Sequence, residues 1–94
     1  MSMEKEVKDK ESLIKVVREA IELLCEKNLS DVVILSSYKI NSVLKENYGV
    51  DIRADKVGRI LSNVAKRNQL KRLKTGIPKY KLHTSKLSTL NFSV

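Results

Sequence analysis

A stripe of apolar residues at helical spacing runs through residues 12–28, SLIKVVREAIELLCEKN. Leu13, Val17, Ile21 and Leu24 recur at three- and four-residue intervals, which predicts an amphipathic helix. Apolar residues at positions 16, 20 and 23 widen this stripe. A wide stripe indicates contacts on two sides of the helix. One side is expected to face the core of the domain, and the other to face either another element or a second subunit.

Two shorter elements follow this helix. DVVILS, residues 31–36, is a β-branched apolar run too brief for a buried helix, so it predicts either a strand or an extended connector. Ser36 and Ser37 then offer an N-cap for a second helix over about residues 38–48. Gly49 supplies the left-handed residue at which such a helix ends.

A third helix is predicted over about residues 54–67, ADKVGRILSNVAKR, and its two faces differ sharply. Asp55 in its first turn suits the helix dipole. The inward stripe is apolar and consists of Val57, Ile60, Leu61 and Val64. The outward face carries four cations and an amide, namely Lys56, Arg59, Asn63, Lys66 and Arg67. Gly58 lowers the helix stability by about 1 kcal/mol relative to Ala, and it permits either a close helix crossing or a close approach of a partner.

Residues 70–82 predict a β-hairpin. Gly and Pro in the sequence TGIP separate two strand-like runs, 70–74 and 79–82, and such a separation is typical of a turn between paired strands. Tyr80 and Leu82 are expected on one face of the second strand, because side chains alternate along a strand. Lys79 and Lys81 are then expected on the opposite face.

The predicted elements form one domain, residues 12–82, because 94 residues provide room for one modest core. A polar extension, residues 1–11, precedes the domain, and a tail, residues 83–94, follows it without a pattern that assigns its structure. No apolar run approaches the roughly 20 residues that span a bilayer, and no secretory signal is recognised at the N-terminus. The single Cys25 excludes an internal disulfide and a cysteine metal cluster, so a reducing cytoplasm is the expected compartment.

The net charge of +8 is concentrated in one segment. Residues 1–52 carry 8 basic and 10 acidic side chains, a net charge of −2. Residues 53–82 carry 10 basic side chains and one acid, a net charge of +9, and residues 83–94 add +1, so the three parts sum to +8. Such asymmetry favours a polyanionic partner that contacts one face. The alternative is a basic surface that serves solubility alone.

The order of these elements resembles the winged helix-turn-helix family of DNA-binding domains. The resemblance covers about residues 12–82 and rests on the element order, on the VGRIL run of the third helix and on the TGIPKYKL hairpin. It implies an α+β, mainly helical fold with three helices plus a C-terminal β-hairpin wing. It also implies that the wing, about residues 70–82, lies along the DNA backbone or in the minor groove.

The third helix meets the physical requirements of a recognition helix. A DNA major groove is about 12 Å wide and admits one α-helix, which must be apolar behind and polar in front. Lys56 and Arg59 are candidates for contacts with guanine edges or phosphates, and Asn63 for contacts with adenine. Lys66 and Arg67, toward the end of the helix, are candidates for phosphate contacts. The alternative for each of them is a solvated helix face.

The hairpin and the start of the second helix supply further candidates for DNA binding. The hairpin cations continue the basic segment and comprise Arg72, Lys74, Lys79 and Lys81. Their alternative role is to discourage pairing of an exposed strand edge. Ser37 and Lys39 lie where a helix N-terminus can hold a phosphate, with plain N-capping as the alternative.

The expected function is a sequence-preferring double-stranded DNA-binding protein acting in transcriptional regulation. One alternative is a winged-helix protein-interaction subunit of a replication, transcription or RNA-processing complex, with the first helix and the apolar tail as partner surfaces. RNA binding is a further alternative, weakened because few aromatic residues are free to stack on bases. A homodimer through residues 12–28 or the tail is expected, and a membrane partner is not.

Catalysis is not expected, and no catalytic residue, cofactor or metal site is assigned. His83 is the only histidine, and no Cys, Asp or Glu lies near it in the sequence. Cys25 lies on the apolar stripe of the first helix and is expected to be a buried, small hydrophobic residue. The chain also has no glycine-rich loop of the kind that cradles phosphates.

Overall fold

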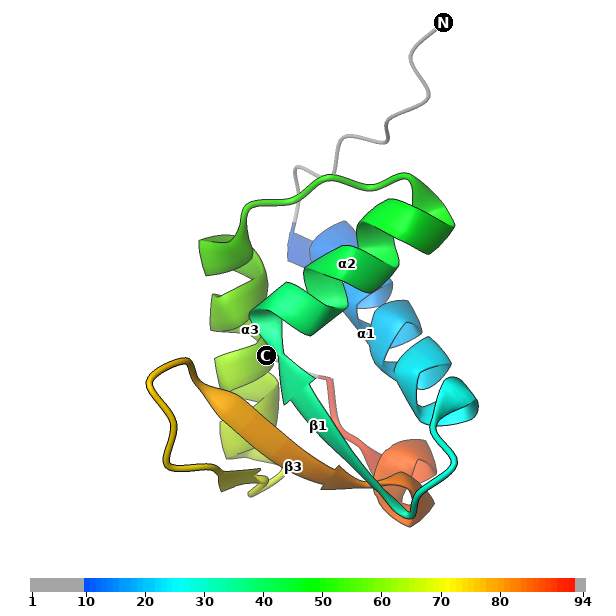
Figure 1. The fold of residues 1–94 in the computed structure, drawn as a ribbon. Coiled ribbons are helices and arrows are strands. Elements are labelled where there is room, and N and C mark those ends of the chain that lie inside the picture. Colours follow the sequence, from blue (N-terminus) through cyan, green and yellow to red (C-terminus); the bar gives the residue numbers. More distant parts are fainter. Residues whose placement is uncertain (1–9, 93–94) are drawn as a thin grey trace, which may run out of the picture.

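The computed structural model describes residues 10–92, which form an α+β fold with three α-helices and a small three-stranded antiparallel sheet (Figure 1). The helices are α1 (Lys10–Lys27), α2 (Ser37–Tyr48) and α3 (Ala54–Arg67), the strands are β1 (Val32–Ser36), β2 (Lys71–Arg72) and β3 (Lys79–His83), and a 3-10 helix, η1 (Thr84–Thr89), follows. All three predicted helices are confirmed, and residues 32–36 are a strand rather than a connector. Most of the predicted N-terminal extension, residues 1–9, lies outside the described residues, and residues 10 and 11 belong to α1.

Two of the helix ends are fixed by local chemistry. The Oγ of Ser36 accepts a hydrogen bond from the backbone N–H of Lys39 at 3.2 Å, so Ser36 is the N-cap of α2. Gly49 ends α2 in the left-handed region at φ 63°, as predicted. Arg53 precedes α3 without a capping side-chain bond, but its guanidinium lies 3.3 Å from the Asp55 carboxylate.

The register of the sheet sorts the hairpin side chains onto two faces. The strand order is β1-β3-β2, with Leu35 and Arg72 opposite Tyr80, and with Ile34 and Lys71 opposite Lys81. Directly opposed residues share a face, because side chains alternate in step along paired strands. Tyr80 and Leu82 are buried while Lys79 and Lys81 are partly exposed, so the alternation predicted for β3 is confirmed.

The core lies between the three helices and the inner face of the sheet, which is the face that carries Leu35, Tyr80 and Leu82. The whole predicted apolar stripe of α3 is buried in it, at Val57, Ile60, Leu61 and Val64. This burial fixes which side of α3 faces outward. Figure 1 shows the loop between β2 and β3 projecting beside α3.

The segment after β3 folds back against α1. Leu87, Leu90 and Phe92 are half-buried against the core, and the Arg18 guanidinium lies over the Phe92 ring, 5.6 Å from its centroid. The second side of the wide stripe on α1 therefore meets another element of the same chain. Val94, the last apolar residue of the tail, lies outside the described residues.

Candidate nucleic-acid interface

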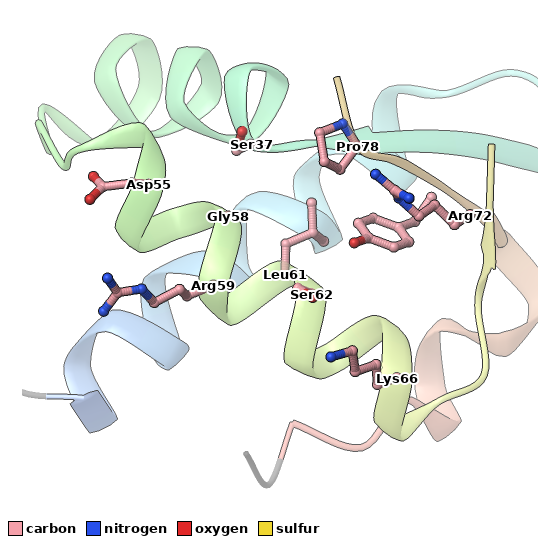
Figure 2. Close-up of a pocket in the computed structure, with 10 residues that line it drawn as sticks. Ser37, Asp55, Gly58, Arg59, Leu61, Ser62, Lys66, Arg72 and Pro78 are labelled. Atoms are coloured by element: carbon pink, nitrogen blue, oxygen red, sulfur yellow. The ribbon is translucent and has the colours of Figure 1, made fainter. Parts of the chain in front are cut away.

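A groove of about 510 Å³ separates α3 from the β2–β3 hairpin (Figure 2). Residues of three elements form it. Helix α3 supplies Gly58 and Ser62 among others, the hairpin supplies Pro78 and Tyr80, and the start of α2 supplies Ser37. We call it the α3 groove.

Arg59, Ser62 and Lys66 form one stripe on the outward side of α3. Their spacing of three and four residues places them above one another, because such positions are neighbours on a helix surface. Arg59 and Lys66 both line the α3 groove, as does Asp55 one turn before Arg59. The groove side of α3 therefore carries two cations and one acid, and two of the five predicted α3 contacts lie in the groove.

The other three predicted residues of α3, Lys56, Asn63 and Arg67, are exposed but do not line the groove. At 3.6 residues per turn they lie roughly a quarter of a turn further round the helix than Lys66. Helix α3 thus presents a continuous polar surface with two parts. One part faces the hairpin across the groove, and the other faces solvent beyond it.

Arg72 is the hairpin cation that lies in the α3 groove. It shares the inner face of the sheet with Tyr80, its partner in the register, and both residues line the groove. Figure 2 shows Arg72 on the hairpin side and Lys66 projecting from α3. The guanidinium of Arg72 and the cations of α3 therefore contribute to one basic surface.

The remaining predicted hairpin cations do not face α3. Lys79 and Lys81 lie on the outer face of the sheet together with Lys71, which is directly opposite Lys81. Lys74 is exposed in the loop, which is closed where the Leu73 N–H donates to the Lys79 carbonyl at 2.8 Å. The structure thus divides cations that sequence reasoning treated as one group.

The two serines at the start of α2 have different roles. Ser36 is the N-cap, whereas Ser37 lines the α3 groove beside Gly58. A Cβ on Gly58 would lie 3.8 Å from the Ser37 Cβ, an ordinary contact distance, so this is where α3 passes close to the start of α2. Lys39 points elsewhere, and its Nζ lies 3.4 Å from the Ile34 carbonyl oxygen of β1.

The α3 groove carries an excess of positive charge. Arg59, Lys66 and Arg72 line it, and Asp55 is the one acid among its lining residues. Asp55 is in turn paired with Arg53. An anionic ligand is therefore favoured at this groove over a cationic one.

Sequence reasoning missed Ser62 and Tyr80 as groove residues. Ser62 follows Arg59 by three positions, so helical spacing alone contained the signal. Tyr80 was expected to share a face with Leu82, as the structure shows, but its pairing with Arg72 depends on the hairpin register, which no local motif specifies.

Within residues 10–92, no group of three or more His, Cys, Asp or Glu side chains is arranged to hold a metal ion. None of the helices described combines the length and the apolar character required to cross a membrane. Comparison with known protein families, with curated proteins and with solved structures finds no significant match to this chain.

Proposed function

We propose that this protein is a winged-helix protein that binds double-stranded DNA. Helix α3 enters the major groove, and the β2–β3 hairpin acts as a wing on the backbone or in the minor groove. The observation that carries the proposal is that Arg59 and Lys66 of α3 and Arg72 of the hairpin line one groove. Phosphate contacts of this kind supply most of the affinity of a protein for DNA.

The order of elements supports the same proposal. The chain runs α1-β1-α2-α3-β2-β3, which is the order on which the resemblance to winged-helix domains rests. The burial of one face of α3 leaves the opposite, polar face free to enter a major groove. In this arrangement the hairpin stands beside the recognition helix, where it meets the flanking backbone.

The proposed contacts divide between bases and phosphates. Arg59 and Asn63, in the middle of α3, read guanine and adenine edges, with Lys56 beside them. Lys66 and Arg67, together with Arg72 of the hairpin, contact phosphates. Because base contacts confer sequence preference, we propose that the protein acts as a transcriptional regulator. A homodimer that places two α3 helices on a palindromic site remains a prediction.

The alternative function, a protein-interaction subunit, depends on two partner surfaces, and one of them is covered in the structure. It required the apolar tail to be available to a partner, but Leu87, Leu90 and Phe92 pack against the chain's own core. No observation in the described residues favours it over DNA binding.

The salt dependence of duplex binding tests the proposal. The three proposed phosphate contacts, Lys66, Arg67 and Arg72, predict a slope of log K against log salt of about −2.7, because each contact contributes about −0.9. Binding to a random-sequence duplex, measured by fluorescence anisotropy between about 50 and 200 mM salt, should therefore weaken steeply. A slope near zero, or no binding at the lowest salt, would exclude a duplex interface in the α3 groove.

Selection of bound sequences from a random duplex pool provides the second test. Enrichment of a motif is expected, and Arg59→Ala should then weaken binding to that motif by about 1–3 kcal/mol while relaxing the preference at one base. Lys66→Ala should weaken binding to all sequences about equally. An equal loss on every sequence for Arg59→Ala would reassign Arg59 to a phosphate.

A further inference from the structure

We propose that a second groove, on the outer side of the hairpin, binds a single strand of nucleic acid by stacking a base on Tyr38. This groove measures about 470 Å³ and lies between the start of α2, β1 and the hairpin loop. The residues that matter for the inference are Ile34, Tyr38, Lys39, Ser42, Thr75 and Lys79. We call it the outer groove. The inference is independent of the proposed duplex site.

Tyr38 is the aromatic residue that fits this purpose. Its exposed fraction is 59%, whereas Tyr80 is 8% exposed and the Phe92 ring is covered by Arg18. An aromatic side chain this exposed contributes little to the core. A tyrosine beside lysines in a groove is the usual means by which proteins hold unpaired bases.

Cations lie in a row across the outer face of the sheet. The Lys39 ammonium lies 3.4 Å from the carbonyl oxygen of Ile34, Ile34 is opposite Lys81, and Lys81 is opposite Lys71. Lys79 is two residues from Lys81 on the same face and also lines the groove. These cations thus come from α2, β3 and β2, and β1 lies between Lys39 and Lys81 without contributing a cation.

Repulsion among these cations destabilises the free protein, and binding of an anion relieves that repulsion. Like charges directly opposite each other in a sheet are destabilising, and Lys71 and Lys81 form such a pair. None of the residues that line the outer groove is acidic, so no carboxylate in the lining neutralises Lys39 and Lys79. A phosphodiester backbone that crosses the sheet would relieve this repulsion.

Tyr38 together with Lys39 and Lys79 favours a single strand over a duplex as the ligand of this groove. In a duplex the faces of each base are covered by its stacked neighbours, so Tyr38 has no face on which to stack. In a single strand the base is free to lie on the tyrosine ring while its phosphates contact Lys39 and Lys79. Ser42, one turn after Tyr38, and Thr75 of the loop place hydroxyls beside the same groove.

The two grooves lie on either side of one hairpin, since Arg72 and Tyr80 face inward while Lys79 and Lys81 face outward. If both proposals hold, the protein prefers a junction between duplex and single strand over either alone. This preference rests on the proposed function, whereas single-strand binding in the outer groove does not.

Binding of fluorescein-labelled 12-nucleotide oligothymidine and of a blunt duplex, measured by anisotropy at low salt, tests the inference. Tyr38→Ala should weaken oligothymidine binding by about 5- to 150-fold, the range that loss of one stacked base supports. Duplex binding should not change, and Tyr38→Phe should keep most of the affinity for oligothymidine. Tyr48→Ala is the matched control, because Tyr48 is also exposed on α2 but at its other end. It should leave both affinities unchanged.

Three results would overturn the inference: no binding of oligothymidine by the wild type, equal losses in Tyr38→Ala and Tyr48→Ala, or no loss in Tyr38→Ala. Failure of the duplex proposal gives a different pattern, in which the duplex is not bound while oligothymidine binding still depends on Tyr38. Oligouridine in a parallel titration distinguishes an RNA strand from a DNA strand as the better ligand. Circular dichroism of each variant establishes that its fold is retained.

Discussion

Among the described residues, two adopt the left-handed backbone conformation, and its steric cost differs between them. Gly49, after α2, has φ 63° and is the residue type for which this region carries no steric cost. Gln69, after α3, has φ 56° and carries a Cβ. The Leu70 N–H donates to the Ala65 carbonyl at 2.9 Å, so the turn at Gln69 is part of a hydrogen-bonded helix end.

Replacing Gln69 with glycine should therefore stabilise the protein. We expect Gln69→Gly to raise the free energy of unfolding by about 0.5–1 kcal/mol, because the relief of left-handed strain exceeds the entropy cost of glycine. Gly49→Ala is the opposite change at an equivalent helix end and should destabilise by about 1 kcal/mol. Urea denaturation followed by circular dichroism measures both. A loss of stability in Gln69→Gly would mean that the glutamine side chain makes a contact outweighing the strain.

The ionisation of Cys25 is coupled to folding. Its thiol is buried in α1, and burial, with a smaller contribution from the charge of Glu22, raises its pKa above the ordinary value of 9.0. The folded state thus holds the thiol proton more tightly than the unfolded state. This contribution to stability is fully present below the unfolded pKa and is lost as pH rises through the folded pKa.

We accordingly expect the free energy of unfolding to fall as pH increases above about 9, with Cys25 responsible for part of the fall. Cys25→Ala should remove that part, so the difference between wild type and variant should shrink with rising pH. Urea titrations at several values between pH 7 and 10 measure it. A difference that stays constant over this range would show that Cys25 has the same pKa in both states. Labelling of the native thiol at pH 8 should also be slow.

At the scale of elements, hydrogen bonds between Asn68 and Asn91 connect the C-terminal segment to the end of α3. The Asn68 Nδ2 donates to the Val64 and Asn91 carbonyls, each at 2.8 Å, and its Oδ1 accepts from the Asn91 N–H at 2.7 Å. The amide of Asn68 thus ends its own helix and holds a segment 23 residues away. Phe92 then reaches the Arg18 guanidinium on α1.

Asn68→Ala should loosen this attachment. We expect a loss of about 1–2 kcal/mol in stability, because three hydrogen bonds disappear while the Asn91 backbone groups remain partly solvated. Hydrogen exchange should become faster at the Asn91 amide. Asn47→Ala is the matched control, since the Asn47 Nδ2 donates only to Val43 of its own helix at 3.2 Å, so its loss should be smaller. Equal losses in the two variants would show that the bonds to Asn91 contribute nothing.

The elements also show what the sequence could and could not specify. The apolar stripe of α3 and the glycine stop of α2 are local patterns, and both are present in the structure. The separation of Arg72 from Lys79 and Lys81 could not be predicted from the sequence, because the register of β2 against β3 depends on the conformation of the loop between them, residues 73–78. The fold of the last residues likewise depends on contacts with Asn68 and Arg18, which no periodicity of the tail reveals.

At the scale of the whole molecule, the position of the charge matters more than its amount. The net charge is +8, but the first half of the chain is nearly balanced. The α3 groove is lined mostly by residues of the basic second half, whereas the outer groove combines residues 34–42 with the hairpin. A general attraction to polyanions depends on net charge, whereas a localised interface depends on particular cations. Two variants with the same net charge can separate these possibilities.

We expect Lys66→Gln with Arg72→Gln to weaken duplex binding far more than Lys15→Gln with Lys27→Gln, although each pair lowers the net charge from +8 to +6. Lys66 and Arg72 line the α3 groove, while Lys15 and Lys27 are exposed on α1 and line neither groove. Removing two phosphate contacts should make the slope of log K against log salt less negative by about 1.8. Removing distant charges should leave the slope almost unchanged. Anisotropy titrations at four salt concentrations provide the slopes, with thermal unfolding to establish that both variants remain folded. Equal slopes for the two variants would mean that duplex DNA is attracted by the molecule as a whole and not held at the α3 groove.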